Sequence, residues 1–224
     1  MVVLEVGQID GRALSGASAY RVEFVRDWRT AESRWSGGFG GTNFQDRLWL
    51  DAWYRAFDQV SPLIAIITND TTHAEVALVP LIHHVHGGIR RVEFADLELT
   101  DYNAPLLGIG APTDAASARA VCRALIAALR KLPEGADLLR MKKMPADIGG
   151  RPNPFLVLGR LGSCSLNGNL IEVGEDFGAY LSSIKKMQLP RSWRVFSRYA
   201  GASFSIVDNA DEALRLIDVM DAQQ

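Results

Sequence analysis

The chain has 224 residues, of which 48% are hydrophobic and 22% are charged. A chain of this length and composition can bury its own core, which excludes intrinsic disorder and makes disulfide bonds unnecessary. With 24 Lys and Arg against 26 Asp and Glu, the net charge of -2 gives no general attraction to nucleic acid or anionic lipid.

The first predicted elements are a strand and an amphipathic helix. Residues 20–25 alternate apolar and polar side chains, which predicts a strand. The glycine-rich stretch 37–41 is interpreted as a flexible connector rather than a phosphate-binding loop. Asn43 is then a candidate N-cap for a helix that extends to Phe57. Its expected apolar stripe consists of Phe44, Leu48, Ala52, Trp53 and Phe57.

Several closely spaced strands follow. Residues 62–68 are apolar throughout, which predicts a strand covered on both faces. Residues 75–83 and 89–95 are expected to form a hairpin around the Gly87-Gly88 turn, and residues 101–109 a fourth strand. A long helix capped by Thr113 or Asp114 ends near Pro133, and residues 137–141 return as a strand. This order predicts a mixed α/β fold.

The residue pattern of the sequence changes beyond Pro145, and we expect a first domain over residues 1–165 and a second over 166–224. The second contains a short helix at 177–184, a basic segment at 185–199, a strand at 202–207 and a helix capped by Asn209 with Glu212. This last helix has no stop signal, so the second domain is expected to be incomplete. An unpaired strand and apolar face there favour self-association through residues 166–224.

The longest apolar stretches have the length of strands, well below the roughly 20 residues of a membrane-spanning helix. Residues 1–10 carry Glu5 and Asp10 and lack a basic segment, unlike a secretory signal. Cys122 and Cys164 have no metal-ligand spacing. We therefore expect no membrane insertion and a cytoplasmic location.

Three histidines, His83, His84 and His86, lie near the hairpin. On a strand, His84 and His86 share one face and His83 points away, so two imidazoles could form half of a zinc site. No third ligand stands at a suitable spacing. A polar hairpin end is therefore the favoured interpretation, and no metal is expected.

Two further groups could carry chemistry. Gly108 and Gly110 lie between a strand and a helix, where backbone amides can hold a pyrophosphate, although a plain turn is the favoured interpretation. Asp101 and Tyr102 begin an apolar strand and could orient or deprotonate a substrate; the alternative is a turn with Tyr102 in the core. The basic segment 185–199 could contact phosphate, but a solvated helix face is favoured.

Several segments together resemble the CelD-type (cellulose-biosynthesis-associated, BioF2-like) branch of the GNAT acyltransferases. They are the aromatic-rich helix at 43–57, the strand at 63–68, the Val-Ala-Leu-Val-Pro-Leu-Ile run at 76–82, the segment 90–94, the Asp-Tyr strand at 100–106, and the later segments 189–199, 202–207 and 211–220. Pro105 stands where the family's pyrophosphate loop carries Arg or Gln, and Pro112 removes an amide donor.

The resemblance implies a GNAT-like α+β fold, with a mixed, mostly antiparallel sheet flanked by helices and the opening of a second GNAT-like unit. It implies transfer of an acyl group from acyl-CoA, such as acetyl-CoA, to the amine or hydroxyl of a small-molecule or saccharide acceptor, in exopolysaccharide or cellulose biosynthesis. Asp101 and Tyr102 would then be catalytic, and Gly108 and Gly110 would bind the cofactor.

Two alternatives stay open. One is a non-catalytic GNAT-like binding or scaffold domain. The other is a FemABX-like transferase that uses aminoacyl-tRNA, which the net charge of -2 disfavours, so no nucleic-acid partner is expected. Because the pyrophosphate loop departs from the family pattern, the chain alone is expected to bind acyl-CoA no more tightly than about millimolar.

Overall fold

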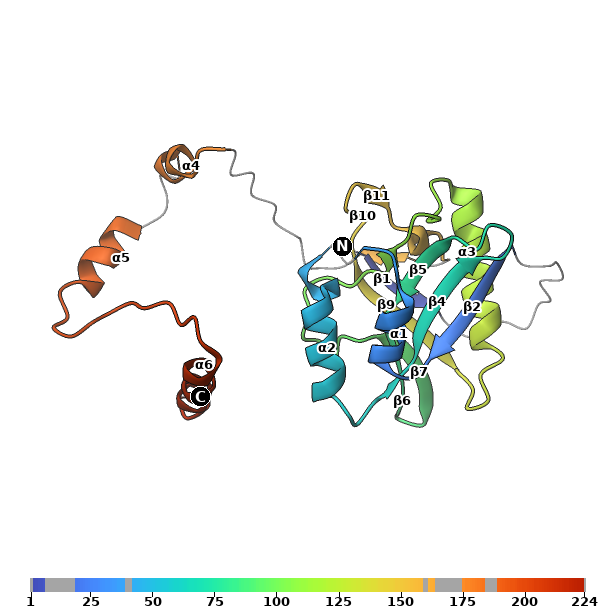
Figure 1. Ribbon diagram of the computed structural model, residues 1–224, viewed down its shortest axis with the longest axis horizontal. Coiled ribbons are helices and arrows are strands. Elements are labelled where there is room, and N and C mark those ends of the chain that lie inside the picture. The colour runs from blue at the N-terminus through green and yellow to red at the C-terminus, as the bar shows by residue number, and fades with distance from the viewer. Residues whose placement is uncertain are drawn as a thin grey trace. The chain divides into compact units, whose positions relative to one another are not determined.

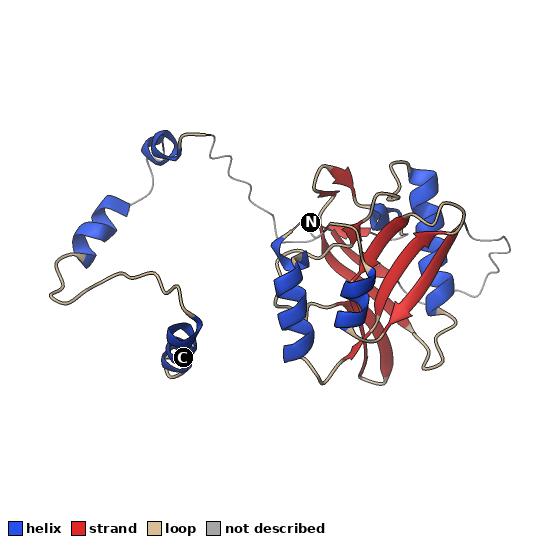
Figure 2. Cartoon of the chain, in the orientation of Figure 1, coloured by secondary structure: helices blue, strands red, loops and turns tan. Residues whose placement is uncertain are grey.

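The structure is a computed structural model that describes residues 2–6, 19–38, 42–158, 161–163, 175–183 and 189–223. The chain divides into two compact units, Met1–Gly168 and Asn169–Gln224. Unit 1 combines β-sheets with flanking helices, which confirms the predicted mixed α/β, or α+β, fold (Figures 1 and 2).

Unit 1 contains a six-stranded sheet in the order β12-β1-β9-β7-β6-β3, a four-stranded sheet in the order β2-β4-β5-β8, and a small β10-β11 ribbon. Among the described strands, β7 and β9 alone pair in parallel, so the sheets are mostly antiparallel, as predicted. The strands are β1 (Val2–Val6), β2 (Tyr20–Val25), β3 (Ser61–Pro62), β4 (Ile64–Asn69), β5 (Glu75–Val79), β6 (Leu81–His86), β7 (Ile89–Phe94), β8 (Leu106–Leu107), β9 (Leu138–Met144), β10 (Asp147–Ile148), β11 (Arg151–Pro152) and β12 (Leu161–Ser163).

The helices of unit 1 are α1 (Trp28–Arg34), α2 (Arg47–Ala56) and α3 (Ala115–Leu129), with short 3-10 turns η1 (Asn43–Gln45) and η2 (Pro154–Val157). The predicted cap of α3 is confirmed, because Asp114 accepts hydrogen bonds from the amides of Ala116 and Ser117 at 2.8 and 2.9 Å. The prediction for α2 was wrong at its start. Asn43 begins the 3-10 turn, and Asp46 caps the helix through the Leu48 amide.

The apolar face of α2 agrees with the predicted stripe at Trp53, which is buried, but differs from it at Leu48. Leu50, Trp53 and Tyr54 are buried, whereas Leu48 is 79% exposed. Residues three and four apart share a helix face, so Leu50, Trp53 and Tyr54 point the same way. Leu48 lies two residues before Leu50 and therefore points to the opposite side.

The strands of the two larger sheets have a hydrophobic core on each of their two faces. On one face, α1 and α2 cover a cluster that includes Ile64, Ile66, Leu78 and Ile82. On the other, α3 and η2 cover the alternate residues of β4, Ala65 and Ile67, together with residues of β7 and β9. Strand β4 is thus covered on both faces, as its continuous apolar sequence predicts.

Pro80 breaks the predicted strand 75–83 into β5, in the four-stranded sheet, and β6, in the six-stranded sheet. The chain that pairs with β5 and β6 is interrupted by a longer segment. Leu78 of β5 pairs with Leu106 of β8, and Leu81 of β6 pairs with Phe94 of β7. Residues 95–105, between β7 and β8, therefore form an excursion from the strand pairing. The predicted strand 101–109 is therefore wrong except at Leu106–Leu107. Residues 96–103 instead form side-chain hydrogen bonds that are incompatible with a regular strand.

Unit 2 contains α4 (Phe177–Ser183), α5 (Leu189–Phe196) and α6 (Ala210–Asp221). The predicted capping of α6 is confirmed. The Glu212 amide donates to the Asn209 side-chain oxygen at 2.8 Å, and the Asn209 side-chain nitrogen donates to the Glu212 carboxylate at 3.0 Å. The predicted strand 202–207 is wrong: this segment has no regular structure, because the described residues of unit 2 offer it no strand to pair with. Cys164, the predicted strand at 170–173, and Lys185 and Lys186 lie outside the described residues.

In the part of the chain that the structure describes, each helix is too short or too polar to cross a bilayer.

Candidate functional site

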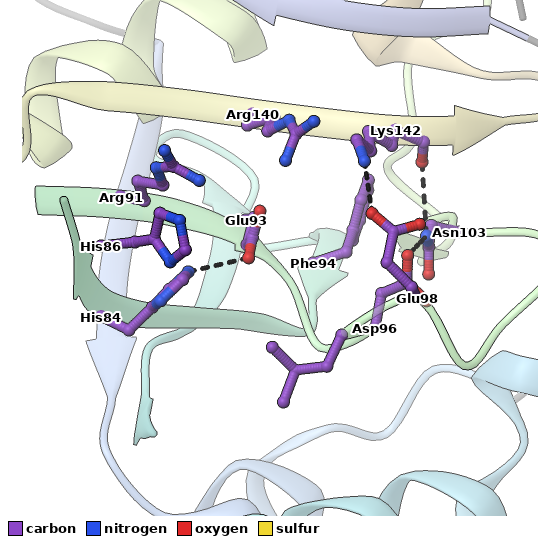
Figure 3. A pocket seen from close by; sticks show the side chains of 11 residues that line it. His84, His86, Arg91, Glu93, Phe94, Asp96, Glu98, Asn103, Arg140 and Lys142 are labelled. Atoms are coloured by element: carbon purple, nitrogen blue, oxygen red, sulfur yellow. Dashed lines mark hydrogen bonds and ion pairs between the residues drawn. The ribbon is translucent and has the colours of Figure 1, made fainter. Parts of the chain in front are cut away.

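The sheet face that α1 and α2 cover changes character along β6. Ile82 still belongs to the buried cluster, but His84 and His86, the next residues on that face, do not. The hairpin register sets His84 opposite Arg91, and the parallel pairing sets Glu93 opposite Arg140. The half of the face formed by β6, β7 and β9 therefore presents polar side chains (Figure 3).

A pocket of about 210 Å³ lies over this polar half-face. This volume corresponds to roughly seven water molecules and is comparable to the volume of a small ligand. All of its lining residues belong to unit 1. They are His84, His86, Arg91, Glu93, Phe94, Asp96, Leu97, Glu98, Asn103, Arg140 and Lys142.

His84 and Glu93 form the closest polar pair in the pocket. The His84 Nε2 lies 2.7 Å from a Glu93 carboxylate oxygen, and the two side chains are only 18% and 16% exposed. When Nε2 carries the proton, it donates to the carboxylate and leaves a lone pair on Nδ1. A histidine held in this way is suited to accept a proton from a substrate.

Two arginines from neighbouring parallel strands line the same pocket. Arg91 on β7 and Arg140 on β9 lie on the side of the sheet that carries the His84 and His86 rings (Figure 3). The Arg91 Nε is buried, and among the described residues it has no hydrogen-bond partner. A buried guanidinium nitrogen without a protein partner is a ready donor for a ligand oxygen.

The excursion 95–105 forms one wall of the pocket and is held by a buried polar cluster. Asp96 accepts from the Thr100 amide at 2.8 Å and from the Asn103 side chain at 3.1 Å. The Lys143 ammonium lies 3.1 Å from Asp96 and donates to the Thr100 carbonyl at 2.7 Å. All four residues are at least nine-tenths buried, so each polar group has its partner within the cluster.

The same cluster fastens the wall to β9. The Asn103 amide donates to the Lys143 carbonyl at 3.0 Å, and its side chain donates to the Lys142 carbonyl at 3.3 Å. Lys143, Leu97 and Glu98 have positive φ angles of 59°, 46° and 65°. Left-handed residues other than glycine carry strain that the surrounding contacts must offset, and here they shape the pocket wall.

Charged neighbours shift the pKa values of this wall. Burial lowers the pKa of Lys143, but hydrogen bonding and attraction from Asp96 and Glu98 outweigh it, and the net shift is upward. The hydrogen bond from Lys142 leads the lowering of the Glu98 pKa, against a smaller opposing effect of burial. Lys143 and Glu98 therefore stay charged near neutral pH.

The residues predicted as catalytic lie in this wall segment but outside the pocket lining. Asp101 is exposed and Tyr102 is half-buried. The lining instead contains Asp96, Glu98 and Asn103 from the same segment. The catalytic assignment of Asp101 and Tyr102 remains a prediction from the resemblance.

Gly108 and Gly110, the predicted cofactor residues, pack against the β5 backbone. Their amides donate to the carbonyls of Val76 and Glu75 at 3.0 and 2.7 Å. A Cβ at Gly108 would lie 2.3 Å from the Glu75 carbonyl oxygen, so glycine is required there by close packing. These amides are engaged within the sheet, and the Asp114 carboxylate occupies the α3 N-terminus. Both features disfavour pyrophosphate at this loop.

The sequence predicted a polar hairpin end at His84, with half of a zinc site as the alternative, and the pairing of His84 with Glu93 was not predicted. A signal was present, because a two-residue Gly87-Gly88 turn sets His86 opposite Ile89, which makes His84 and Glu93 diagonal neighbours. The hairpin itself is confirmed: Gly87 and Gly88 have φ angles of 60° and 78°.

The three histidines have separate surroundings. The His83 Nε2 lies 2.9 Å from the Gly135 carbonyl, so His83 points away from the pocket that His84 and His86 line. Over the described residues, no three His, Cys, Asp or Glu side chains come together as a metal site would require.

Comparison with family models, with curated proteins and with solved structures finds no match to this chain.

Proposed function

We propose that the chain is an acyl-CoA-dependent N- or O-acyltransferase and that the pocket of unit 1 holds the acceptor. The observation that carries the proposal is the His84–Glu93 pair inside the pocket, 2.7 Å apart and largely shielded from solvent. Acyl transfer to an amine or hydroxyl requires removal of a proton from the nucleophile. In this proposal, His84 Nδ1 accepts that proton, and Glu93 holds the ring and stabilises its charge.

The position of the pocket also supports the proposal. β7 and β9 pair in parallel from Arg91 to Glu93, and α3 lies between them in the sequence. Beyond Glu93 the strands no longer pair, and the excursion 95–105 lies against β9 in place of β7. The GNAT enzymes that the sequence resembles use such a divergence of strands for acyl transfer.

The proposal covers the acceptor side alone. The amides of Gly108 and Gly110 are engaged with β5, and Asp114 places a negative charge at the α3 N-terminus. Repulsion between this carboxylate and a pyrophosphate supports weak binding of acyl-CoA by the chain. We propose a saccharide or other small acceptor, in exopolysaccharide or cellulose biosynthesis, and a cytoplasmic location, where acyl-CoA is available.

The test is acetyl transfer at millimolar acetyl-CoA to a panel of amino sugars and sugar acids, followed by mass spectrometry. We expect an acetylated product with the unmodified chain. His84→Gln should lower kcat by about 100-fold or more, the effect of losing a general base. His73→Gln, which alters an exposed histidine outside the pocket, is the matched control and should leave kcat unchanged.

Two results would contradict the proposal. Transfer that persists in His84→Gln but is lost in Asp101→Asn would place the base where the resemblance puts it. Absence of any acetylated product would favour the second candidate, a non-catalytic binding domain. That candidate is favoured specifically by the engaged amides of Gly108 and Gly110.

A further inference from the structure

We infer that the pocket recognises an acceptor that carries an oxyanion, a carboxylate or a phosphate, and that Arg91 binds it. The identification of this ligand as the acyl acceptor rests on the proposed function. The binding of the oxyanion itself depends only on the pocket.

The first step is the charge balance of the pocket. Each of its three carboxylates already has a partner in the protein: Glu93 contacts His84, Glu98 contacts Lys142 and Lys143, and Asp96 contacts Lys143. The lining carries three cationic side chains, Arg91, Arg140 and Lys142, against these three carboxylates. Among the described residues, the ion pairs that engage the carboxylates come from His84, Lys142 and Lys143, and none of them involves Arg91.

The second step is the state of Arg91. Among the described residues, no carboxylate forms an ion pair with its guanidinium, and its Nε is buried without a hydrogen-bond acceptor. Leaving a charged donor buried and unsatisfied is costly, so a ligand oxygen that reaches it gains more than it would in water. The planar guanidinium offers paired N–H donors that match two oxygens of a carboxylate or of a phosphate.

The third step is the position of Arg91 relative to the proposed base. Arg91 lies directly opposite His84 in the hairpin register, so the two side chains are neighbours on one face (Figure 3). An anion held by Arg91 would bring the rest of a small molecule over the His84–Glu93 pair. Given the pocket volume of about 210 Å³, a sugar acid is a suitable size.

The experiment is isothermal titration of the full chain with glucuronate, glucose 6-phosphate and glucose. We expect glucuronate and glucose 6-phosphate to bind and glucose to bind at least about tenfold more weakly than either, since only glucose lacks the anion. Arg91→Gln should weaken glucuronate binding by about tenfold and leave glucose unchanged. Arg91→Lys, which keeps the charge but loses the paired donors, should be intermediate.

Arg123→Gln is the matched control, because Arg123 is exposed on α3, on the face opposite the pocket, and its loss changes the net charge equally. It should bind glucuronate within about twofold of the unmodified chain. Thermal melts of all variants verify that they fold.

Equal binding of glucuronate and glucose, an unchanged affinity in folded Arg91→Gln, or no binding of either anion would overturn the inference. The relative affinities of glucuronate and glucose 6-phosphate identify which oxyanion the pocket takes. The proposed function fails separately: glucuronate binding that depends on Arg91, without any acetyl transfer, would refute the transferase and leave the anion site intact.

Discussion

At the scale of single residues, the site depends on side chains whose partners are fixed by the fold. Glu93 holds His84, while Lys143 compensates the buried Asp96 and thereby secures the pocket wall. The two pairs differ in role. In the proposed function, the first pair accepts a proton from a ligand. The second pair joins Asp96, in the pocket wall, to Lys143 on β9 and keeps the wall in place.

Replacement of Lys143 tests the structural role of the second pair. Lys143→Met would leave the Asp96 carboxylate buried without its cation, and we expect a loss of about 3–5 kcal/mol in the free energy of unfolding. Urea denaturation measures this loss. Lys142→Met, which removes a more exposed partner of Glu98, should cost less than about 1 kcal/mol. Equal losses in the two variants would show that the Asp96 cluster does not hold the wall.

At the scale of elements, local patterns predicted the regular parts of unit 1 well. The α3 cap at Asp114, the Gly87-Gly88 hairpin and the strand before Asn69 were predicted, because neighbours in sequence determine them. Helix α1 was not predicted: it is only seven residues long, too short to show a clear periodicity. Its cap at Asp27, which accepts from the Thr30 amide at 2.7 Å, was the available signal.

The candidate site was less accessible to sequence reasoning, for a physical reason. The excursion 95–105 is stabilised by Lys143, more than 40 positions away in the chain, so no local pattern could distinguish it from a strand. The His84–Glu93 contact was different. It follows from the hairpin register and could have been predicted once the Gly87-Gly88 turn was assigned.

Helix α2 provides a test of the corrected packing. Trp53 is 3% exposed and contacts Tyr54 and Phe57 at ring distances of 5.3 and 4.8 Å. Trp53→Ala should therefore lower the free energy of unfolding by about 3–5 kcal/mol. Leu48→Ala, from the originally predicted stripe, should change it by less than about 0.5 kcal/mol. Thermal or chemical denaturation measures both losses. Similar losses in the two variants would show that Leu48 is buried as well, as the sequence pattern predicted.

The ion pair between Arg90, in the hairpin, and Asp137, just before β9, gives a pH-dependent prediction. Hydrogen bonds from Arg90, chiefly from its side chain, lower the Asp137 pKa below its ordinary value of 3.8. A carboxyl group with a lowered folded-state pKa adds stability above its unfolded-state value, and this stability is lost as the pH falls through the folded-state pKa. Asp137→Asn should therefore be less stable than the unmodified chain at neutral pH, and the difference should shrink below pH 3.8.

Denaturation in urea from about pH 7 to about pH 2 measures the difference. Asp101→Asn is the control, because Asp101 is exposed and lies outside the pocket lining. A difference between Asp137→Asn and the unmodified chain that does not change with pH would show that the Arg90–Asp137 pair contributes nothing through charge.

At the scale of the whole molecule, the arrangement of unit 1 explains where a site can form. Helix α3 covers one face of the sheet, whereas α1 and α2 cover only the part of the other face that ends at Ile82. The remaining half-face carries polar side chains and the pocket. A sheet face that is polar rather than apolar does not need a covering helix, and it is therefore available to a ligand.

The exposed apolar face of α6 in unit 2 predicts self-association. The α6 side chains Leu214, Ile217 and Met220 are 62%, 51% and 62% exposed, so no described residue of unit 2 covers them. We expect self-association through this helix, measurable by sedimentation velocity as a concentration-dependent species larger than a monomer. Ile217→Lys should restore the monomer, and Arg215→Lys on the same helix should not. A monomer at all concentrations would contradict the prediction.

Amide chemical-shift perturbation on glucuronate binding locates the site within the chain. We expect the largest shifts on β6, β7 and the pocket wall, at His84, Arg91, Glu93 and Glu98, and at Arg140 on β9. Shifts that concentrate instead at Gly108, Gly110 and the start of α3, or within unit 2, would contradict this expectation and move the site away from the pocket.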